Sequence, residues 1–294
     1  MHCLTVDVED YFQVAAFRNS VSQTDWDRLP SRVEANTAKV LDLFDELGVK
    51  GTFFVLGWVA EKFPAVVRRI ANAGHELGCH SYSHQLIYEL GPSAFQQDTA
   101  RALDAIQQAS SERVTFYRAP SFSITQRSLW ALEILLEAGF THDSSIFPVR
   151  HDLYGMPAPQ EPFVISVAGA QLVEFPPSTV RPLRTSLPVT GGGYTRILPF
   201  FYQRSALRML ETNGIPGMVY LHPWELDPEQ PRIDAPLPSR LRHYTGLSRT
   251  EKRIRKLVAE FRFAPMSAVL AGPLPVFELV ANRFQARAEE VASC

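Results

Sequence analysis

Residues Gly51–Gly57 (GTFFVLG) form a continuous apolar run that is bounded by glycine at both ends. Such a run is typical of a strand covered on both faces, as in a parallel sheet. A helical pattern precedes it over Val33–Leu47, and another follows over Pro64–Gly74. Together with the apolar run Leu4–Val8, the order is strand, helix, strand, helix. This order predicts an α/β fold with parallel strands and crossover helices.

The pattern continues more loosely through the middle of the chain. Residues 93–108 and 127–138 have helical spacing, and Val114–Tyr117 resembles a strand. Ser31-Arg32-Val33-Glu34 has the spacing of a capping box at the start of the first helix.

The second half of the chain has a different composition. Residues 148–238 hold 15 of the 22 prolines, which predicts long loops that decorate the fold. Within this part we expect a helix near 200–213 and a strand over Met218–His222. A last amphipathic helix is expected over Arg249–Phe261. We therefore predict one domain over residues 1–274, followed by a tail or a terminal helix over 275–294.

The composition excludes several classes of protein. The chain has 294 residues, 29 Lys and Arg against 31 Asp and Glu, and 46% apolar residues. This is typical of a globular protein rather than a disordered chain or a nucleic-acid binder with a basic field. No stretch has the roughly 20 apolar residues of a membrane-spanning helix. The N-terminus lacks a signal-peptide pattern, and three widely spaced cysteines do not suggest a disulfide framework. We therefore expect a cytoplasmic protein.

Two polar clusters suggest a metal site. Asp7-Val8-Glu9-Asp10 places three carboxylates at the end of the first strand, where their repulsion calls for a cation, a shared proton or water. Alone, this cluster is equally typical of a solvated strand end. His80 and His84 are four residues apart, so one helical turn would bring both imidazoles to one face. Two histidines and a carboxylate can bind a divalent cation and leave positions open for water and substrate.

Further polar residues follow other strand-like runs. His222 ends the apolar run Val219–Leu221 and can act as an acid or a base near neutral pH, or lie half-buried under Trp224. Arg118 can hold a carboxylate with two hydrogen bonds, and Asp143 follows another strand start. Taken singly, Arg118 and Asp143 are better explained as surface ion-pair partners.

The chain resembles the polysaccharide deacetylases of the NodB-homology family (carbohydrate esterase family 4) over about residues 4–224. The resemblance rests on motifs in the family's order, namely the acidic strand end, GTFFVLG, GHELGCHSYSH (74–84), YRAPSFS (117–123), HDSS (142–145) and LHP (221–223). Residues 191–200 (GGGYTRILPF) and 222–233 (HPWELDPEQPRI) resemble a subgroup found with bacterial exopolysaccharide and exosortase (PEP-CTERM) gene clusters.

This resemblance implies a distorted (β/α)7-type barrel, the NodB-homology or glycoside hydrolase/deacetylase barrel. It implies a metal-dependent hydrolase that removes N-acetyl groups from N-acetylhexosamine units of a polysaccharide or its lipid-linked precursor, in exopolysaccharide biosynthesis. One divalent metal ion is implied, zinc in the first place, with cobalt, nickel or manganese as alternatives. Two other functions stay open: a hydrolase of small amides or cyclic ureides on the same barrel, and a non-catalytic glycan-binding scaffold protein.

Carried over by position, the resemblance also implies roles for individual residues. His80 and His84 would be metal ligands, and Asp7 the general base that Arg118 orients. His222 would be the general acid, with Asp143 tuning it. We predict substrate contacts from Pro120, Ser121, Phe122, Gly192, Tyr194, Leu221 and Trp224, with a backbone N–H after Pro120 facing the oxyanion.

One position departs from the family's pattern. Many members carry adjacent aspartates (TFDDG), but Val8 takes the second place here. The metal carboxylate must therefore come from Glu9 or from Asp10. Members with the pattern D-x-D favour Glu9.

The expected partner is an N-acetylated glycan or a lipid-linked oligosaccharide, not a nucleic acid. The stretch Arg232–Lys256 carries eight basic side chains against Asp234 and Glu251. We interpret it as a solvated helix face. The alternative is contact with an anionic glycan, a lipid pyrophosphate or the inner face of the membrane.

Overall fold

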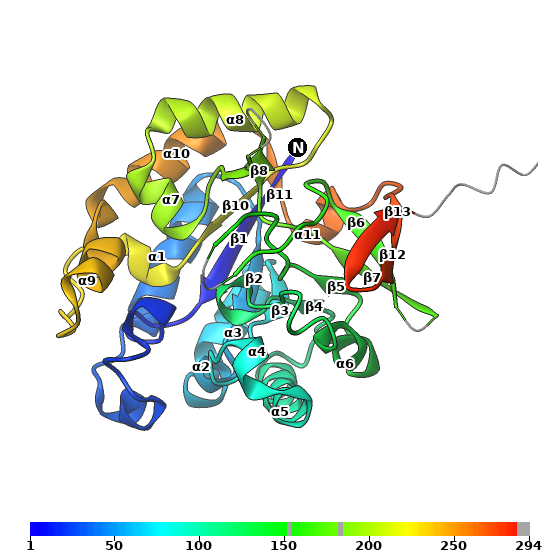
Figure 1. Ribbon diagram of the computed structural model, residues 1–294. Coiled ribbons are helices and arrows are strands. Elements are labelled where there is room, and N and C mark those ends of the chain that lie inside the picture. Colours follow the sequence, from blue (N-terminus) through cyan, green and yellow to red (C-terminus); the bar gives the residue numbers. More distant parts are fainter. Residues whose placement is uncertain (152–153, 168, 182–184, 287–294) are drawn as a thin grey trace, which may run out of the picture.

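The computed structural model describes residues 1–151, 154–167, 169–181 and 185–286. A single large sheet runs through these residues, with helices packed around it (Figure 1). Within it, neighbouring strands pair in parallel in the order β10–β1–β2–β3–β4–β5–β7. Their bounds are β1 His2–Val8, β2 Thr52–Val55, β3 Glu76–Cys79, β4 Phe116–Tyr117, β5 His142–Asp143, β7 Ala170–Glu174 and β10 Met218–Leu221. The expected α/β fold with a parallel sheet is confirmed.

Helices cross over between successive strands of this sheet. Helices α2, α3 and α5 pack against one another beside strands β2–β4 (Figure 1). The helices are α1 Val33–Glu46, α2 Gly57–Lys62, α3 Pro64–Asn72, α4 Ile87–Leu90, α5 Pro92–Ser110, α6 Ala131–Glu137, α7 Gly192–Ile197, α8 Phe200–Thr212, α9 Leu237–Tyr244, α10 Thr250–Glu260 and α11 Met266–Val269. Among the described helices, none combines the length and apolarity needed to cross a bilayer.

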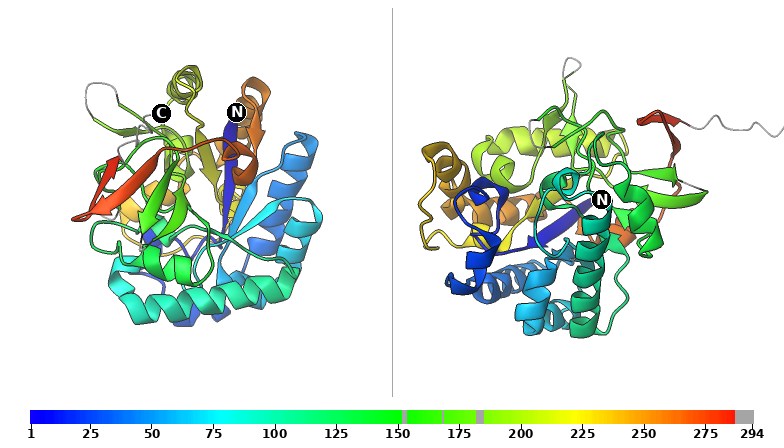
Figure 2. Two further views of the ribbon diagram at one scale, coloured as in Figure 1. Left: turned by 90° about the vertical axis from the view of Figure 1, so that its right-hand side faces the viewer. Right: turned by 60° about the horizontal axis from the view of Figure 1, so that its bottom comes forward.

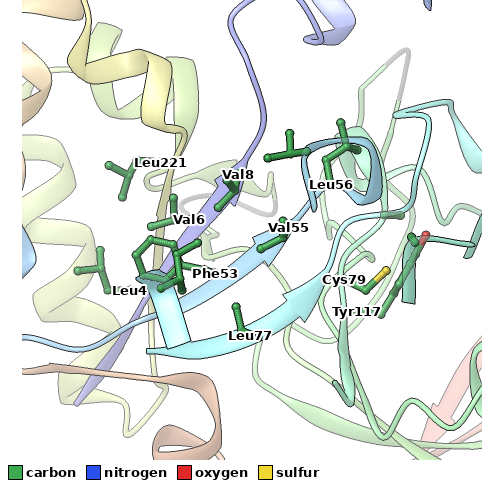
Figure 3. Close-up of a cluster of buried hydrophobic side chains, with 14 of the residues drawn as sticks. Leu4, Val6, Val8, Phe53, Val55, Leu56, Leu77, Cys79, Tyr117 and Leu221 are labelled. Atoms are coloured by element: carbon green, nitrogen blue, oxygen red, sulfur yellow. The ribbon is translucent and has the colours of Figure 1, made fainter. Parts of the chain in front are cut away.

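Strand β1 is buried along its whole length because it lies between β10 and β2. Its side chains alternate between two apolar regions, as in any strand. Leu4, Val6 and Val8 join the main core, together with residues of β2 and β3 such as Phe53 and Leu77 (Figure 3). Cys3 points the other way, into a smaller cluster. This alternation leaves positions 5 and 7 on the side away from the main core.

A second region of the core lies on the opposite side of the sheet. Phe54, Phe116 and Met218 pack there with Cys3. Gly78 on β3 makes room for them, because a Cβ at this position would come within 2.5 Å of the Phe54 ring. The Arg118 guanidinium lies 4.1 Å from the centre of the same ring. The charged side chain of Arg118 is therefore buried in this apolar region.

The part expected to form long loops contributes strands to the sheet. Strand β6 (Phe163–Val167) pairs antiparallel with β7, and the two form the hairpin that extends the parallel strands. Short strands β8 (Thr179–Val180) and β9 (Leu187–Pro188) pair with each other. Next to them, Ser178 Oγ accepts the Met218 N–H at 2.5 Å and Thr190 Oγ1 donates to the Met218 carbonyl at 2.6 Å. This segment is thereby attached to β10.

The end of the chain differs from its expected form. The sequence predicts a tail or helix after residue 274, but residues 276–280 and 283–286 form strands β12 and β13. Strand β12 pairs in parallel with β6, and β13 pairs antiparallel with β12. Both views in Figure 2 show this hairpin as the red end of the described chain. Residues 287–294, including Cys294, lie outside the described residues.

The first helix begins at a carboxylate from a distant part of the chain. The sequence predicts a capping box from Ser31 to Glu34, and this prediction is wrong. Asp10 Oδ2 instead accepts the backbone N–H groups of Arg32 at 2.9 Å and Val33 at 3.2 Å. Ser31 Oγ donates to the same oxygen at 2.5 Å. The buried carboxylate satisfies the open N–H groups of α1 and ties it to the end of β1.

Replacing Asp10 by alanine should therefore destabilise the fold. The loss of a cap and the burial of unpaired N–H groups together cost about 2 kcal/mol or more. Urea unfolding measures this change. Asp42, an exposed residue of the same helix, is the control, and Asp42→Ala should change stability by less than about 0.5 kcal/mol. Equal stabilities of the two variants would contradict the role of Asp10.

Candidate metal centre and active site

A cavity of about 400 Å³ opens at the carboxyl ends of the parallel strands. Residues that follow β1, β3 and β10 line it, among them Glu9, His80 and His222. The carboxyl ends of parallel strands meet at one edge of a sheet, where α/β folds place their ligands. The polar residues identified in the sequence therefore converge here from distant positions.

Glu9, His80 and His84 form a group that can hold a metal ion. One donor atom from each lies within 4.8 Å of the others. Glu9 Oε2 is buried without a hydrogen bond of acceptable geometry, although it lies 2.6 Å from His84 Nε2. A buried carboxylate oxygen without a well-formed hydrogen bond is costly, and a cation between these atoms would satisfy it. Two imidazoles and one carboxylate are also a donor set that suits zinc and related ions. The residues therefore fit a divalent cation.

Two of these groups are in the charge state that metal binding requires. Burial lowers the pKa of His80 to about 4, so its imidazole is neutral near pH 7. Its Nδ1 lies 2.8 Å from the Arg118 carbonyl, which accepts a hydrogen bond from Nδ1–H and so leaves Nε2 for a ligand. Burial alone raises the pKa of Glu9, but His84 and His222 outweigh this and lower it to about 2.

The two histidines come together without a helical turn. The sequence predicts one turn of helix over residues 80–84, but this segment is a loop. Ser81 and His84 have φ angles of +62° and +52°, an uncommon conformation for residues other than glycine. The ring centres of His80 and His84 are 5.4 Å apart. Asp98 of α5 fixes the loop by accepting hydrogen bonds from the backbone N–H groups of residues 82 and 83.

Asp10 lies outside the metal group. One of its oxygens accepts three hydrogen bonds at the start of α1, and the other accepts the Tyr11 N–H at 2.9 Å. Both oxygens are therefore occupied by donors. Of the two carboxylates that the sequence left open as a ligand, the structure groups Glu9 with the histidines.

Asp7 lies beside this group and is held by Arg118. The guanidinium donates to Asp7 Oδ1 at 2.6 Å and to Thr5 Oγ1 at 2.9 Å. Its other terminal nitrogen donates to Ser144 Oγ at 3.0 Å. Arg118 is fully buried, so this ion pair is formed away from water. Asp7 Oδ2 remains on the cavity side, 3.9 Å from His222 Nε2.

His222 faces the same carboxylates. Its Nε2 lies 3.5 Å from Glu9 Oε1, and its Nδ1 lies 2.7 Å from Glu225 Oε1. Burial lowers the pKa of His222, but the hydrogen bond to Glu225 and the charge of Glu9 outweigh it and raise the pKa to about 9. Trp224 stacks on the imidazole and donates its Nε1–H to Glu9 Oε1 at 3.2 Å.

Asp143 has different neighbours from those implied by the resemblance. It accepts hydrogen bonds from Ser144 N and Ser145 Oγ, and it interacts with Glu174. Burial raises the pKa of both carboxyls, and the nearby Asp143 raises that of Glu174 further, whereas the hydrogen bond to Glu174 lowers that of Asp143. A hydrogen bond between two carboxyl groups requires a proton on one of them, so the pair shares a proton. Among the described contacts, the carboxylate at His222 Nδ1 is that of Glu225, and none joins Asp143 to His222.

Most of the expected substrate residues line the cavity. Ser121, Phe122, Gly192, Tyr194 and Trp224 do so, but Pro120 and Leu221 do not. Leu221 belongs to the apolar core instead (Figure 3).

Side chains alternate along β10, so Tyr220 and His222 point to the cavity and Leu221 points to the opposite face.

Gly191 packs directly against the Tyr220 ring. A Cβ at position 191 would lie within 1.8 Å of that ring, so only glycine fits there.

Sequence reasoning missed Glu225, Asp98 and Tyr220. A signal existed for Glu225, because an acidic residue three positions after a strand-ending histidine can reach back to it. Alternation along β10 would have identified Tyr220. Asp98 is an ordinary polar residue of an amphipathic helix, and nothing in the sequence around it predicts its hydrogen bonds to the loop at residues 82 and 83.

Comparisons with known proteins agree with this geometry. Residues 18–141 match the polysaccharide deacetylase family, and residues 144–271 match a domain of unknown function (DUF3473). A peptidoglycan-N-acetylglucosamine deacetylase from Bacillus cereus is 37% identical over 98 residues, which cover 33% of this chain and 36% of that protein. A chitooligosaccharide deacetylase from Sinorhizobium fredii is 35% identical over 85 residues, covering 29% and 40%. The matched stretch thus spans well under half of these relatives.

Solved structures show the same fold over nearly the whole chain. A candidate polysaccharide deacetylase from Mycobacterium smegmatis superposes with a TM-score of 0.63 at 20% identity, over 91% of this chain and 87% of that one. An allantoinase superposes with a TM-score of 0.59 at 14% identity, over the same shares. Residues 18–141, somewhat less than half of the chain, are therefore similar to the polysaccharide deacetylase family.

Proposed function

We propose that this protein removes N-acetyl groups from N-acetylhexosamine units of a glycan, with a divalent cation held by Glu9, His80 and His84. The observation that carries the proposal is the position of two proton-transfer groups, Asp7 and His222, beside this metal group in one cavity. The deacetylases among the relatives, which act on peptidoglycan and chitooligosaccharides, support it.

Hydrolysis of an amide requires a stronger nucleophile than water and a protonated leaving group. When bound, a divalent cation acts as a Lewis acid that lowers the pKa of water to about 7 and polarises the acetyl carbonyl. Arg118 occupies Oδ1 of Asp7, so Oδ2 is the atom that takes a proton from the attacking water. His222 Nε2 donates a proton to the amine nitrogen as the C–N bond breaks.

The remaining wall of the cavity suits a sugar. Tyr154, Tyr194 and Phe122 line it, and the two tyrosine hydroxyls are 2.8 Å apart. Aromatic faces pack against the apolar faces of sugar rings, and hydroxyls can bind theirs. Ser121 lies in the wall directly after Pro120, where we propose that its backbone N–H faces the oxyanion.

We further propose that the glycan belongs to an exopolysaccharide pathway. The likeness of residues 191–200 and 222–233 to proteins encoded near exopolysaccharide loci supports an exopolysaccharide or its lipid-linked precursor as substrate. Arg242 of the basic stretch lines the cavity and could meet an anionic group of such a precursor.

The metal site gives a first prediction. We expect purified protein to bind one equivalent of Zn²⁺ and to lose acetate release with a chelator. His84→Ala should lose the metal, because it removes one of three ligands. Asp10→Asn is the matched carboxylate control and should keep it, although it is less stable. Metal content by mass spectrometry measures both.

The outcomes separate the alternatives. Metal binding without acetate release from N-acetylglucosamine oligomers would favour a hydrolase of small amides or ureides. A protein that binds no metal and releases no acetate would favour a glycan-binding scaffold. Equal metal content in His84→Ala and wild type would overturn the ligand set.

The general base gives a second prediction. Asp7→Asn should keep stoichiometric metal but lose ~10²-fold or more in kcat, the usual scale for loss of a general base. Acetate release from N-acetylglucosamine oligomers, measured with metal content on the same sample, tests this. An Asp7→Asn variant with wild-type kcat would show that another group takes the proton.

A further inference from the structure

We infer that Glu225 and Arg196 act together as positioning residues for His222, in the place that the family resemblance gives to Asp143. The inference rests on the proposed function, because it assigns His222 the transfer of a proton to the leaving amine. Its basis is a continuous chain of buried and partly buried hydrogen bonds that ends at the cavity.

Glu225 contacts His222 and Arg196 through separate oxygens. Its Oε1 accepts from His222 Nδ1 at 2.7 Å and from the His222 backbone N–H at 3.1 Å. Its Oε2 accepts from Arg196 Nε at 2.7 Å. The side chain is fully buried. Because an ionised carboxylate only accepts hydrogen bonds, this contact puts a proton on Nδ1 and leaves Nε2 facing the cavity.

Arg196 is held as firmly as its partner. It is 2% exposed, so its charge is compensated by Glu225 away from water. One terminal nitrogen donates to the carbonyls of His243 at 2.6 Å and Thr245 at 2.8 Å. The other donates to the Arg242 carbonyl at 3.3 Å. The guanidinium therefore has a fixed orientation between α7 and the end of α9, and it presents Nε to Glu225.

Trp224 completes the support of the imidazole from its face. It stacks on His222 at 5.0 Å between ring centres and on His243 at 4.2 Å. The Arg196 guanidinium lies 5.2 Å from the Trp224 ring centre. The His222 ring is thus fixed both at its Nδ1 edge and on one face. A carboxylate that fixes an imidazole in this way sets its tautomer and direction, as in the serine hydrolase triad.

His222 and the residues that position it lie in one part of the chain. Arg196, His222, Trp224 and Glu225 all lie in residues 144–271, the part matched by the domain of unknown function. The metal group and Asp7 lie outside that part. We therefore assign to this second part the positioned proton donor of the site, in addition to one wall of the cavity.

The test compares Glu225→Gln, Arg196→Met and the double variant with wild type, all in the metal-loaded full chain. With N-acetylglucosamine oligomers, Glu225→Gln should lower kcat ~10²-fold, within the range of a general acid, while KM stays within about twofold. Arg196→Met should lower kcat less. Because the two residues act as one unit, the double variant should be no slower than Glu225→Gln.

Arg253→Met is the matched control. Arg253 also donates to carbonyls of α7 and the residue after it, those of Thr195 and Leu198, but it has no contact with Glu225 among the described residues. It should leave kcat within about twofold of wild type. An equal loss of kcat in Arg253→Met and Arg196→Met would mean that Arg196 only stabilises α7 and does not position His222. If the fold-loss of kcat in the double variant equals the product of the two single losses, Glu225 and Arg196 act independently and the inference is wrong.

A readout without substrate separates this inference from the proposed function. The ¹⁵N spectrum of the His222 ring, assigned with His222→Gln, should show a protonated Nδ1 that shifts in Glu225→Gln but not in Arg253→Met. An unchanged spectrum would refute the contact. If wild type binds metal but releases no acetate while this shift occurs, the proposed substrate is wrong and the positioning pair stands.

Discussion

The buried guanidinium of Arg118 is the constraint on which the site depends. It lies in the apolar interior against Phe54, where a cation without a counterion would be costly. Its charge is compensated by Asp7 at 2.6 Å, which fixes one oxygen of that carboxylate and directs the other to the cavity. Its backbone carbonyl binds His80 Nδ1 and so orients a candidate metal ligand. One residue at the end of a two-residue strand thus links the metal group to the proton acceptor.

The parallel sheet and most of its helices could be predicted because their signals are local. The apolar run at 51–57, the proline at position 64 and the glycine at position 74 set the ends of elements through backbone and burial preferences alone. The strands β6, β7, β12 and β13 carry no comparable signal. They are short and partly exposed, and the pairing of β12 with β6 joins residues more than 100 positions apart in the chain. The proline-rich composition of residues 148–238 predicts long loops, whereas the structure also has strands and helices there.

The candidate site shows the same division. The four-residue spacing of His80 and His84 predicted that they lie together. The expected helical turn, however, is a loop that is held by hydrogen bonds to Asp98 of α5. The choice between Glu9 and Asp10 also depended on tertiary contacts. Asp10 is needed at the start of α1, 22 residues further on, and that use occupies its oxygens. A sequence pattern can name residue types suited to a metal, but the competing uses of those residues appear only in the folded chain.

The charges of the cavity explain why its two halves must come from distant parts of the chain. Asp7 and Glu9 are buried neighbours on one strand end, and two uncompensated carboxylates there would oppose folding. Arg118 compensates Asp7, whereas the groups around Glu9 in the described part of the chain are imidazoles and the Trp224 indole. His80 is neutral, so the remaining compensation comes from a bound cation or from protonated His222. His222 in turn is held by Glu225, whose own charge Arg196 balances. The second half of the chain therefore completes the electrostatics of the first, which ties the stability of the fold to the chemistry of the site.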